Sequence, residues 1–143
     1  MTKGSLYLIP CTLGDVDINN CLPIYNTSII QSLKYFIVEN ERTARRFLKT
    51  VDKSINIDEL TFYLLNKHTS ESEFNSYLKM TESGHSIGLI SEAGCPAIAD
   101  PGSEIVKLAH KLSIKVVPLV GPSSILLALM SSGFSGQKFE FQG

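Results

Sequence analysis

Cysteine is scarce in this sequence of 143 residues, and long apolar runs are absent. The three cysteines, Cys11, Cys21 and Cys95, lack C-x-x-C spacing, so neither a disulfide framework nor a zinc site is indicated. No apolar run reaches the ~18 residues that a membrane-spanning helix needs, and the N-terminus does not read as a signal peptide. We therefore expect a cytoplasmic protein that binds neither a metal ion nor a membrane.

A large excess of charge of either sign is also missing. The formal net charge is -1 at pH 7, so the chain as a whole has no electrostatic attraction to nucleic acid. Any RNA-binding surface must then be a local cluster of basic residues. The hydrophobic fraction of 43% and the length suit one globular domain with a single core, which we expect to span residues 1–143.

Short apolar runs alternate with stretches of helical periodicity. The apolar runs predict strands at 5–9, 35–38, 61–65, 86–90 and 115–120, and the periodic stretches predict helices at 41–51, 70–82, 102–112 and 121–133. None of the apolar runs alternates cleanly with polar residues, which is typical of strands buried on both faces. The pattern predicts an α/β domain with a mostly parallel sheet of about five strands, covered by helices on both faces.

The helix predicted at 41–51 has two distinct faces. Its apolar stripe consists of Ala44, Phe47, Leu48 and Val51, and the opposite face carries a basic ridge, defined as Arg42, Arg45, Arg46 and Lys49. Four cations on one face suit contacts with RNA phosphates, and the arginines suit the fork geometry of a phosphate. The alternative is an ordinary solvated helix face. The helix predicted at 121–133 is apolar nearly all round, so we expect it to be buried.

Two loops rich in glycine and proline follow predicted strands. "SEAGCPAIADPG" begins at Ser91, and "GPSS" begins at Gly121. Ligands of parallel α/β sheets bind beyond the carboxyl ends of the strands, so these loops could form one pocket for a small polar ligand, held mainly by main-chain groups. The alternative is that both are simple strand-to-helix turns. Neither the G-x-G-x-x-G fingerprint nor a phosphate-binding P-loop occurs, which disfavours pyrophosphate cofactors.

Five segments together carry a resemblance that covers essentially the whole chain. They are "GSLYLIPCTLGD", "FIVENERTARRFL", "GLISEAGCPAIADPG", "PLVGPSSILLALMSSGF" and "FEFQG". In this order they resemble the N-terminal half of the tetrapyrrole-methylase-like family of S-adenosylmethionine-dependent methyltransferases, and most closely its branch that methylates ribose 2'-hydroxyls of small-subunit ribosomal RNA. Members of that family are usually about twice this long. The resemblance therefore implies that a second, C-terminal domain completes the donor site and that this chain alone is inactive.

The resemblance also implies which residues contact the S-adenosylmethionine. They are Pro10, Glu92, Ala93, Gly94, Cys95, Pro96, Ile98, Gly121, Pro122, Ser123 and Ser124. Two departures from the family pattern predict altered contacts with the substrate. The usual T-P-I-G-N reads Cys11-Thr12-Leu13-Gly14-Asp15, and the usual A-E-D-T-R reads Val38-Glu39-Asn40-Glu41-Arg42. The family further implies a homodimer and an RNA substrate.

Methyl transfer from a sulfonium is an in-line displacement that needs no metal ion, but a ribose hydroxyl gains from a base that removes its proton. Glu39, at the end of a predicted strand, is the candidate base, and the alternative is a structural ion pair with Arg42. Two other functions stay open: methylation of a tetrapyrrole, another small molecule or a protein, and a non-catalytic binding or dimerisation module. A tetrapyrrole substrate would not require the basic ridge.

Overall fold

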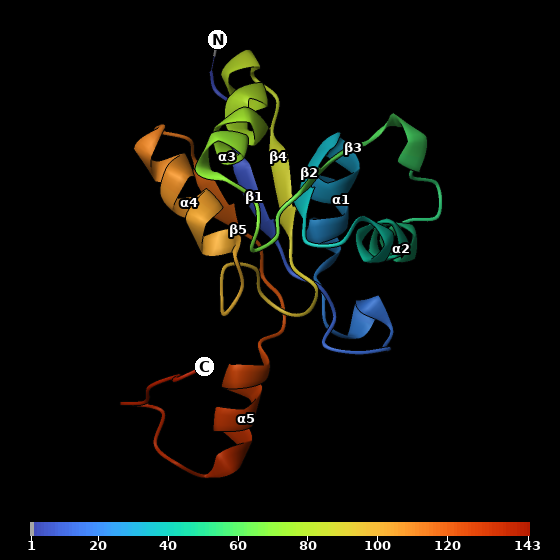
Figure 1. Cartoon of the computed structure of the whole chain (residues 1–143). Helices are drawn as coiled ribbons and strands as arrows, with labels where there is room; N and C mark the ends of the chain where they lie inside the picture. Colours follow the sequence, from blue (N-terminus) through green and yellow to red (C-terminus); the bar gives the residue numbers. More distant parts are fainter. Residues whose placement is uncertain (1) are drawn as a thin grey trace.

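The computed structural model describes residues 2–143, and it contains one parallel sheet with helices on both faces (Figure 1). The strands are β1 (Leu6–Ile9), β2 (Tyr35–Val38), β3 (Thr61–Leu64), β4 (Ile87–Ile90) and β5 (Val116–Pro118). The α-helices are α1 (Ile24–Ser32), α2 (Glu41–Val51), α3 (Glu71–Leu78), α4 (Gly102–Lys111) and α5 (Ser124–Ser132). All five predicted strands and all four predicted helices are confirmed, with ends that differ by a few residues.

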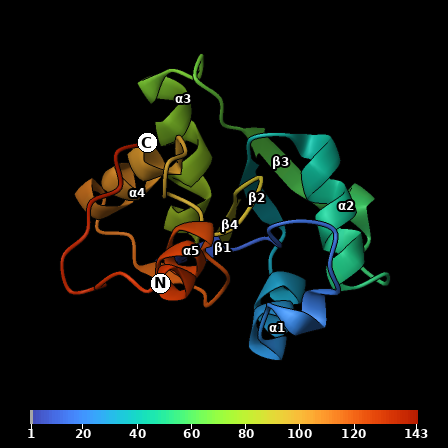
Figure 2. The ribbon, with the colours of Figure 1, turned by 90° about the horizontal axis from the view of Figure 1, so that it is seen from below.

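The strand order is β3-β2-β4-β1-β5, and every pairing is parallel. β4 and β1 lie at the centre, where burial on both faces explains their continuous apolar sequence. Because all strands run the same way, the loops that follow β1, β2, β4 and β5 lie at one edge of the sheet. Figure 2 looks from below toward that edge, with α5 in front of it.

Two separate apolar cores hold the layers together. On one face, Leu78 of α3 and Ile105 of α4 pack with the sheet residues Leu6 and Ile37. On the other face, Ala44 and Leu48 of α2 pack with sheet and α1 residues, as the apolar stripe predicts. Helices packed on both faces of the sheet confirm the α/β architecture.

Two features of the fold differ from the sequence-based expectations. Helix α1 was not predicted, because its apolar residues form no stripe: Ile24 and Tyr25 are exposed while Ile30 is buried. Helix α5 was expected to be buried, which is wrong, since none of its residues is buried and Met130 is 78% exposed. In Figure 1 it stands away from the sheet, and no other described element covers its outer side. In residues 2–143, no helix is long and apolar enough to cross a membrane.

Candidate functional site

The loops after β1 and β4 are tied together at the carboxyl edge of the sheet. The Cys11 amide donates to the Gly94 carbonyl at 3.0 Å, which forms an isolated antiparallel bridge beyond the parallel strands. The Ser91 hydroxyl also donates to the Gly94 carbonyl, at 2.8 Å, and the Cys11 thiol donates to the Ser91 carbonyl at 3.1 Å. Main-chain position in both loops is therefore fixed before any ligand binds.

The loops after β4 and β5 meet through two glycines. Gly94 has a φ of +64°, and a Cβ there would lie 3.2 Å from the Pro122 carbonyl oxygen. A Cβ on Gly121 would lie only 2.2 Å from Cγ of Pro10, so Gly121 permits the close approach of the β5 loop to the β1 loop. The Cys95 thiol donates to the Pro122 carbonyl at 3.3 Å. The three loops thus form one structural unit.

The β4 loop is held in an unusual backbone conformation by Asp100. Ala97 and Ala99 have φ values of 67° and 57°, in the left-handed region that side chains disfavour. The Asp100 carboxylate accepts hydrogen bonds from the Ala97 amide at 2.9 Å and from the Gly102 amide at 2.7 Å. Burial raises the pKa of Asp100, although these two hydrogen bonds act in the opposite direction. Such strain is frequent at ligand sites, which favours the ligand-binding interpretation over that of a simple turn.

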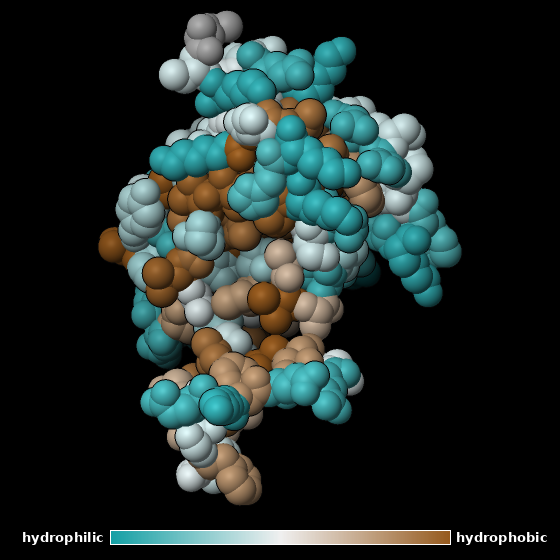
Figure 3. Space-filling view, turned by 90° about the vertical axis from the view of Figure 1, so that its left-hand side faces the viewer, coloured by the Kyte–Doolittle hydropathy of each residue, from teal (hydrophilic) through white to brown (hydrophobic). Residues whose placement is uncertain are grey.

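A pocket of about 190 Å³ opens between the β4 loop and the start of α5. Its lining includes six of the predicted donor-contacting residues: Ala93, Gly94, Cys95, Ile98, Ser123 and Ser124. An adjoining, more apolar cavity of about 470 Å³ shares Cys95, Ile98 and Ser123 and is closed on one side by Phe139 and Phe141. Figure 3 shows apolar side chains at the junction between the body of the domain and the part below it, which consists of α5 and the residues that follow it. We call the two cavities together the loop pocket.

Four of the other predicted donor contacts lie around the loop pocket but do not line it. Pro10 and Gly121 lie against each other, Pro96 is buried, and the Pro122 carbonyl contacts the β4 loop. These residues shape the loops. The loop pocket also has lining residues that sequence reasoning missed, among them Leu13, Ala99 and Ile125. Their position after β1, β4 and β5 was the available signal, since all three follow strands that end at this edge.

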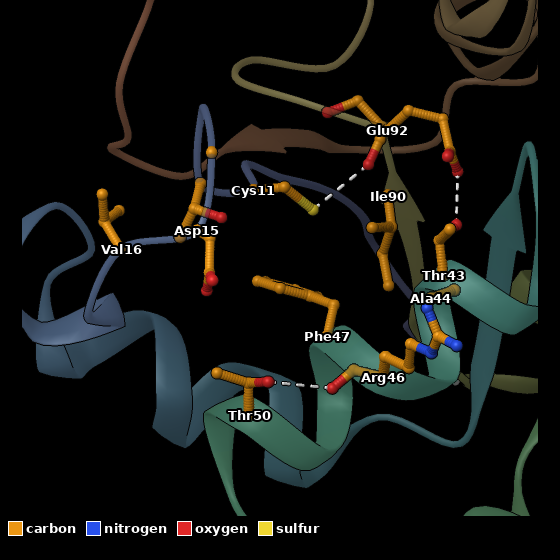
Figure 4. Close-up of a pocket in the computed structure, with 13 residues that line it drawn as sticks. Cys11, Asp15, Val16, Thr43, Ala44, Arg46, Phe47, Thr50, Ile90 and Glu92 are labelled. Atoms are coloured by element: carbon orange, nitrogen blue, oxygen red, sulfur yellow. Dashed lines mark hydrogen bonds between the residues drawn. The ribbon is translucent and has the colours of Figure 1, made fainter.

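Glu92 is placed elsewhere than the resemblance implies. Its carboxylate accepts a hydrogen bond at 2.7 Å from the hydroxyl of Thr43, in the first turn of α2. It lines a different cavity, of about 220 Å³, that lies between the β1 loop and α2 (Figure 4). We call this second cavity the α2 pocket. Glu92 therefore connects the β4 loop to α2 and is absent from the lining of the loop pocket.

Residues from three segments line the α2 pocket. The β1 loop and the end of β4 contribute Cys11, Thr12, Gly14, Asp15, Val16, Ile90, Ser91 and Glu92, and α2 contributes Thr43, Ala44, Arg46, Phe47 and Thr50. In Figure 4 the Phe47 ring projects from α2 toward the loop that carries Cys11 and Asp15. Sequence analysis identified Arg46 as a phosphate contact and placed Thr12 and Asp15 in the β1 loop whose substrate contacts it predicts to be altered, but it gave no role to Thr43 or Thr50.

Glu39, at the same edge, is close enough to two other carboxylates for their charges to act on it. Partial burial raises its pKa, the negative charges of Asp100 and Glu92 raise it further, and a hydrogen bond from the Glu92 backbone opposes them. The alternative of an ion pair with Arg42 is not observed: within residues 2–143 the ion pairs are Arg45 with Glu41 and Lys107 with Glu104. Glu39 lines neither pocket, although its neighbour Glu92 lines the α2 pocket.

The basic ridge divides into two pairs. Arg45 pairs with Glu41 at 2.6 Å and lies over the Phe62 ring, and the Lys49 ammonium donates to the Lys53 and Ile55 carbonyls. Arg42 and Arg46 are exposed, and neither side chain makes an ion pair with another described residue. Two of the four predicted cations are thus already engaged, and two remain available to a phosphate.

The cysteines take the positions of small structural side chains. All three are free thiols, and burial raises the pKa of Cys11 to about 12, so that thiol stays protonated and unreactive at neutral pH. No group of three or more His, Cys, Asp or Glu side chains suited to a metal ion occurs in the part of the chain that the structure describes.

Several curated relatives of this chain carry the same name. The chain is 32% identical over 139 residues to "Ribosomal RNA small subunit methyltransferase I" of Vibrio cholerae, which covers 96% of this chain and 45% of the relative. It is 31% identical over 140 residues to the protein of that name from Bacillus subtilis, covering 98% of this chain and 45% of the relative. The protein of that name from Escherichia coli O157:H7 is 27% identical over 143 residues, covering 99% and 47%.

No family model matches the chain. The chain spans about half the length of the curated relatives that it matches. Because each match runs over nearly all of these 143 residues, it includes both loops of the loop pocket and all of α2. The resemblance that the motifs indicate is confirmed.

Proposed function

We infer that the chain belongs with these ribosomal RNA methyltransferases, and from that premise we propose that it forms the N-terminal domain of an S-adenosylmethionine-dependent methyltransferase that acts on ribosomal RNA. The observation that carries the proposal is the loop pocket: two motif-bearing loops, distant in sequence, form one cavity beyond the carboxyl ends of β4 and β5. This is where ligands bind in sheets of this type.

The loop pocket has features that suit a donor with an adenosine and an amino-acid part. Ala93, Gly94 and Cys95 offer main-chain groups, the Ser123 and Ser124 hydroxyls stand at the start of α5, and Ile98 adds an apolar surface. When bound, the donor would supply the methyl group, and its sulfonium sulfur would leave as a neutral thioether. The chain's own contribution is to hold the donor in a preset orientation, which is the main source of rate in an in-line displacement.

We propose that the acceptor is a ribose 2'-hydroxyl and that Glu39 takes its proton. A carboxylate whose pKa is raised by burial and by two neighbouring carboxylates is a stronger base than an ordinary glutamate. Glu39 also follows β2 directly and so lies at the same sheet edge as the loop pocket. Asp100 and Glu92 then act as positioning residues.

The choice of RNA over a small molecule rests on α2. Arg42 and Arg46 are exposed and outside any ion pair of the described chain, and Arg46 borders a cavity at the loop edge. The proposal includes a cytoplasmic location, a homodimer and a second domain that completes the donor site. The contact surface of the proposed homodimer is the exposed apolar side of α5, which includes Leu126, Leu127 and Met130.

Calorimetric titration with S-adenosylmethionine tests the donor site. We expect weak binding by residues 1–143 and tighter binding by an extended form that includes the proposed second domain. Only the extended form should transfer a labelled methyl group to small-subunit ribosomal RNA. Full transfer by the shorter form would contradict the two-domain site, and absence of donor binding in both forms would overturn the methyltransferase proposal in favour of a binding module.

A further inference from the structure

The α2 pocket and the loop pocket share one wall. The β1 loop places Leu13 in the lining of the loop pocket, whereas its neighbours Thr12, Gly14 and Asp15 line the α2 pocket. The β4 loop divides in the same way, with Ala93 on one side and Glu92 on the other. In each of these two loops, adjacent residues line different cavities, so the loops themselves form the wall between the two pockets. An enzyme that joins two substrates needs this kind of adjacency.

The lining of the α2 pocket combines a stacking surface with groups for polar recognition. Phe47 offers an aromatic ring, and Thr12 and Thr50 also line the cavity, with the Thr50 hydroxyl donating to the Arg46 carbonyl at 3.1 Å. The carboxylate of Glu92 accepts a hydrogen bond from Thr43, that of Asp15 is a further acceptor group in the lining, and the guanidinium of Arg46 carries the positive charge. Unpaired bases of RNA are recognised by stacking on aromatic rings together with hydrogen bonds to their edges, and their phosphates by arginine.

The volume of the α2 pocket limits the size of its ligand. The cavity has a volume of about 220 Å³, which is smaller than the volumes of about 300 to 1,000 Å³ found for pockets that enclose drug-sized ligands. One nucleotide unit fits this limit, with its phosphate left at the rim, whereas a tetrapyrrole or a base pair is too large. Position strengthens the assignment, because Thr43, hydrogen-bonded to Glu92, links the cavity to the β4 loop and so to the carboxylates around Glu39.

We propose that the α2 pocket binds one unpaired nucleotide of the RNA substrate, with its base against Phe47 and its phosphate on Arg46. The inference rests on the proposed function and extends it, since it assigns the acceptor to a cavity that is separate from the donor pocket. It also assigns Arg46 a role that differs from that of the other cations on α2. Arg42 lies on the same helix but outside the cavity, and so contributes only long-range attraction.

The matched pair of variants R46Q and R42Q tests this assignment, because each removes one exposed positive charge from α2. Affinity for a labelled single-stranded RNA oligonucleotide is measured by fluorescence anisotropy at fixed salt. We expect R46Q to weaken binding about tenfold or more, the effect of losing one hydrogen bond to a charged group. R42Q should weaken it clearly less. Equal losses for the two variants would overturn the pocket and leave only a basic surface.

A second measurement locates the ligand directly. Amide resonances of the chain are followed by NMR during titration with a nucleoside monophosphate, with inorganic phosphate as the comparison. We expect shifts in 12–16 and 43–50 with the nucleotide, and shifts near Arg46 alone with phosphate. Nucleotide shifts confined to other residues, or identical responses to both probes, would overturn the proposal. Donor titration of R46Q separates the two ideas: retained donor affinity with lost RNA affinity supports both, and lost affinity for both would contradict a separate acceptor pocket.

Discussion

At the scale of single residues, Glu39 connects stability with function. Its raised pKa means that the Glu39 carboxyl group binds its proton more tightly in the folded protein than in the unfolded chain. This contribution is present at low pH and is lost as the pH rises through the folded-state pKa. At neutral pH the ionised Glu39 therefore destabilises the fold, which is the expected cost of keeping a base in that position.

E39Q should accordingly unfold at a higher denaturant concentration than the wild type at pH 7, and the gain should vanish at acidic pH. The same variant should lower the rate of methyl transfer and leave donor affinity unchanged. Denaturation curves at both pH values and single-turnover assays measure these effects. Unchanged transfer in E39Q would remove Glu39 from the mechanism, and E39D would test whether the carboxylate's reach matters.

Gly121 is the loop-edge glycine at which a side chain has the least room. In G121A the new methyl group would meet the ring of Pro10, whose position is fixed by its backbone. Separation of the two loops should lower the free energy of unfolding by about 1 to 3 kcal/mol, as overpacking does. The loss in the free energy of donor binding should be larger than this loss in stability. Thermal unfolding and donor titration measure both. G136A is the matched control, because a Cβ there meets only Leu129 at 3.7 Å.

At the scale of elements, α2 depends on its N-cap. The Asn40 side chain accepts hydrogen bonds from the amides of Arg42 at 2.9 Å and Thr43 at 3.2 Å. N40A should lower the free energy of unfolding by about 1 kcal/mol, whereas N40D, which keeps the capping oxygen, should stay close to the wild type. Chemical denaturation distinguishes them. Equal stability of N40A and the wild type would mean that packing alone holds the first turn.

The two sides of the basic ridge should also separate in stability measurements. R45A loses an exposed ion pair with Glu41 and its contact with the Phe62 ring, which together should cost up to about 1 kcal/mol. R46A should change stability by less than about 0.5 kcal/mol, since it is an exposed substitution without such partners. For RNA binding the order reverses: R46A should flatten the slope of log affinity against log salt by up to about 0.7 to 0.9. A larger slope change in R45A would contradict this division.

Sequence patterns predicted most elements because their apolar periodicity is strong, as in α2. They failed for α1 because Ile24 and Tyr25 are exposed apolar residues that hide the periodicity. They also failed for the burial of α5. An apolar helix indicates that some partner covers it, but the composition does not show whether that partner is another element of the same chain. The loop pocket was predictable because its motifs are contiguous. The α2 pocket was not, because Asp15, Thr43 and Glu92 meet only after β1, β2 and β4 are aligned.

At the scale of the whole molecule, the proposed dimer contact is the exposed apolar side of α5. Substituting Met130, which is 78% exposed, should not disturb the sheet, because α5 contributes no buried residue. We expect M130E to reduce self-association measured by sedimentation velocity while the melting temperature of the monomer stays the same. K107E, an exposed change on α4, is the control. Unchanged association in M130E would rule out this side of α5 as the contact.

The strand order has a consequence for the synthesis of the chain. β1 is the first strand to leave the ribosome, yet Leu6 pairs with Ile87 on one side and with Val116 on the other. Until those segments emerge, β1 has no partner, and only β2 and β3 can associate. Such long sequence separations slow folding and leave an apolar strand exposed to aggregation in the meantime. In a nascent chain the apolar β1 therefore stays without its sheet partners until nearly all of the domain has been translated.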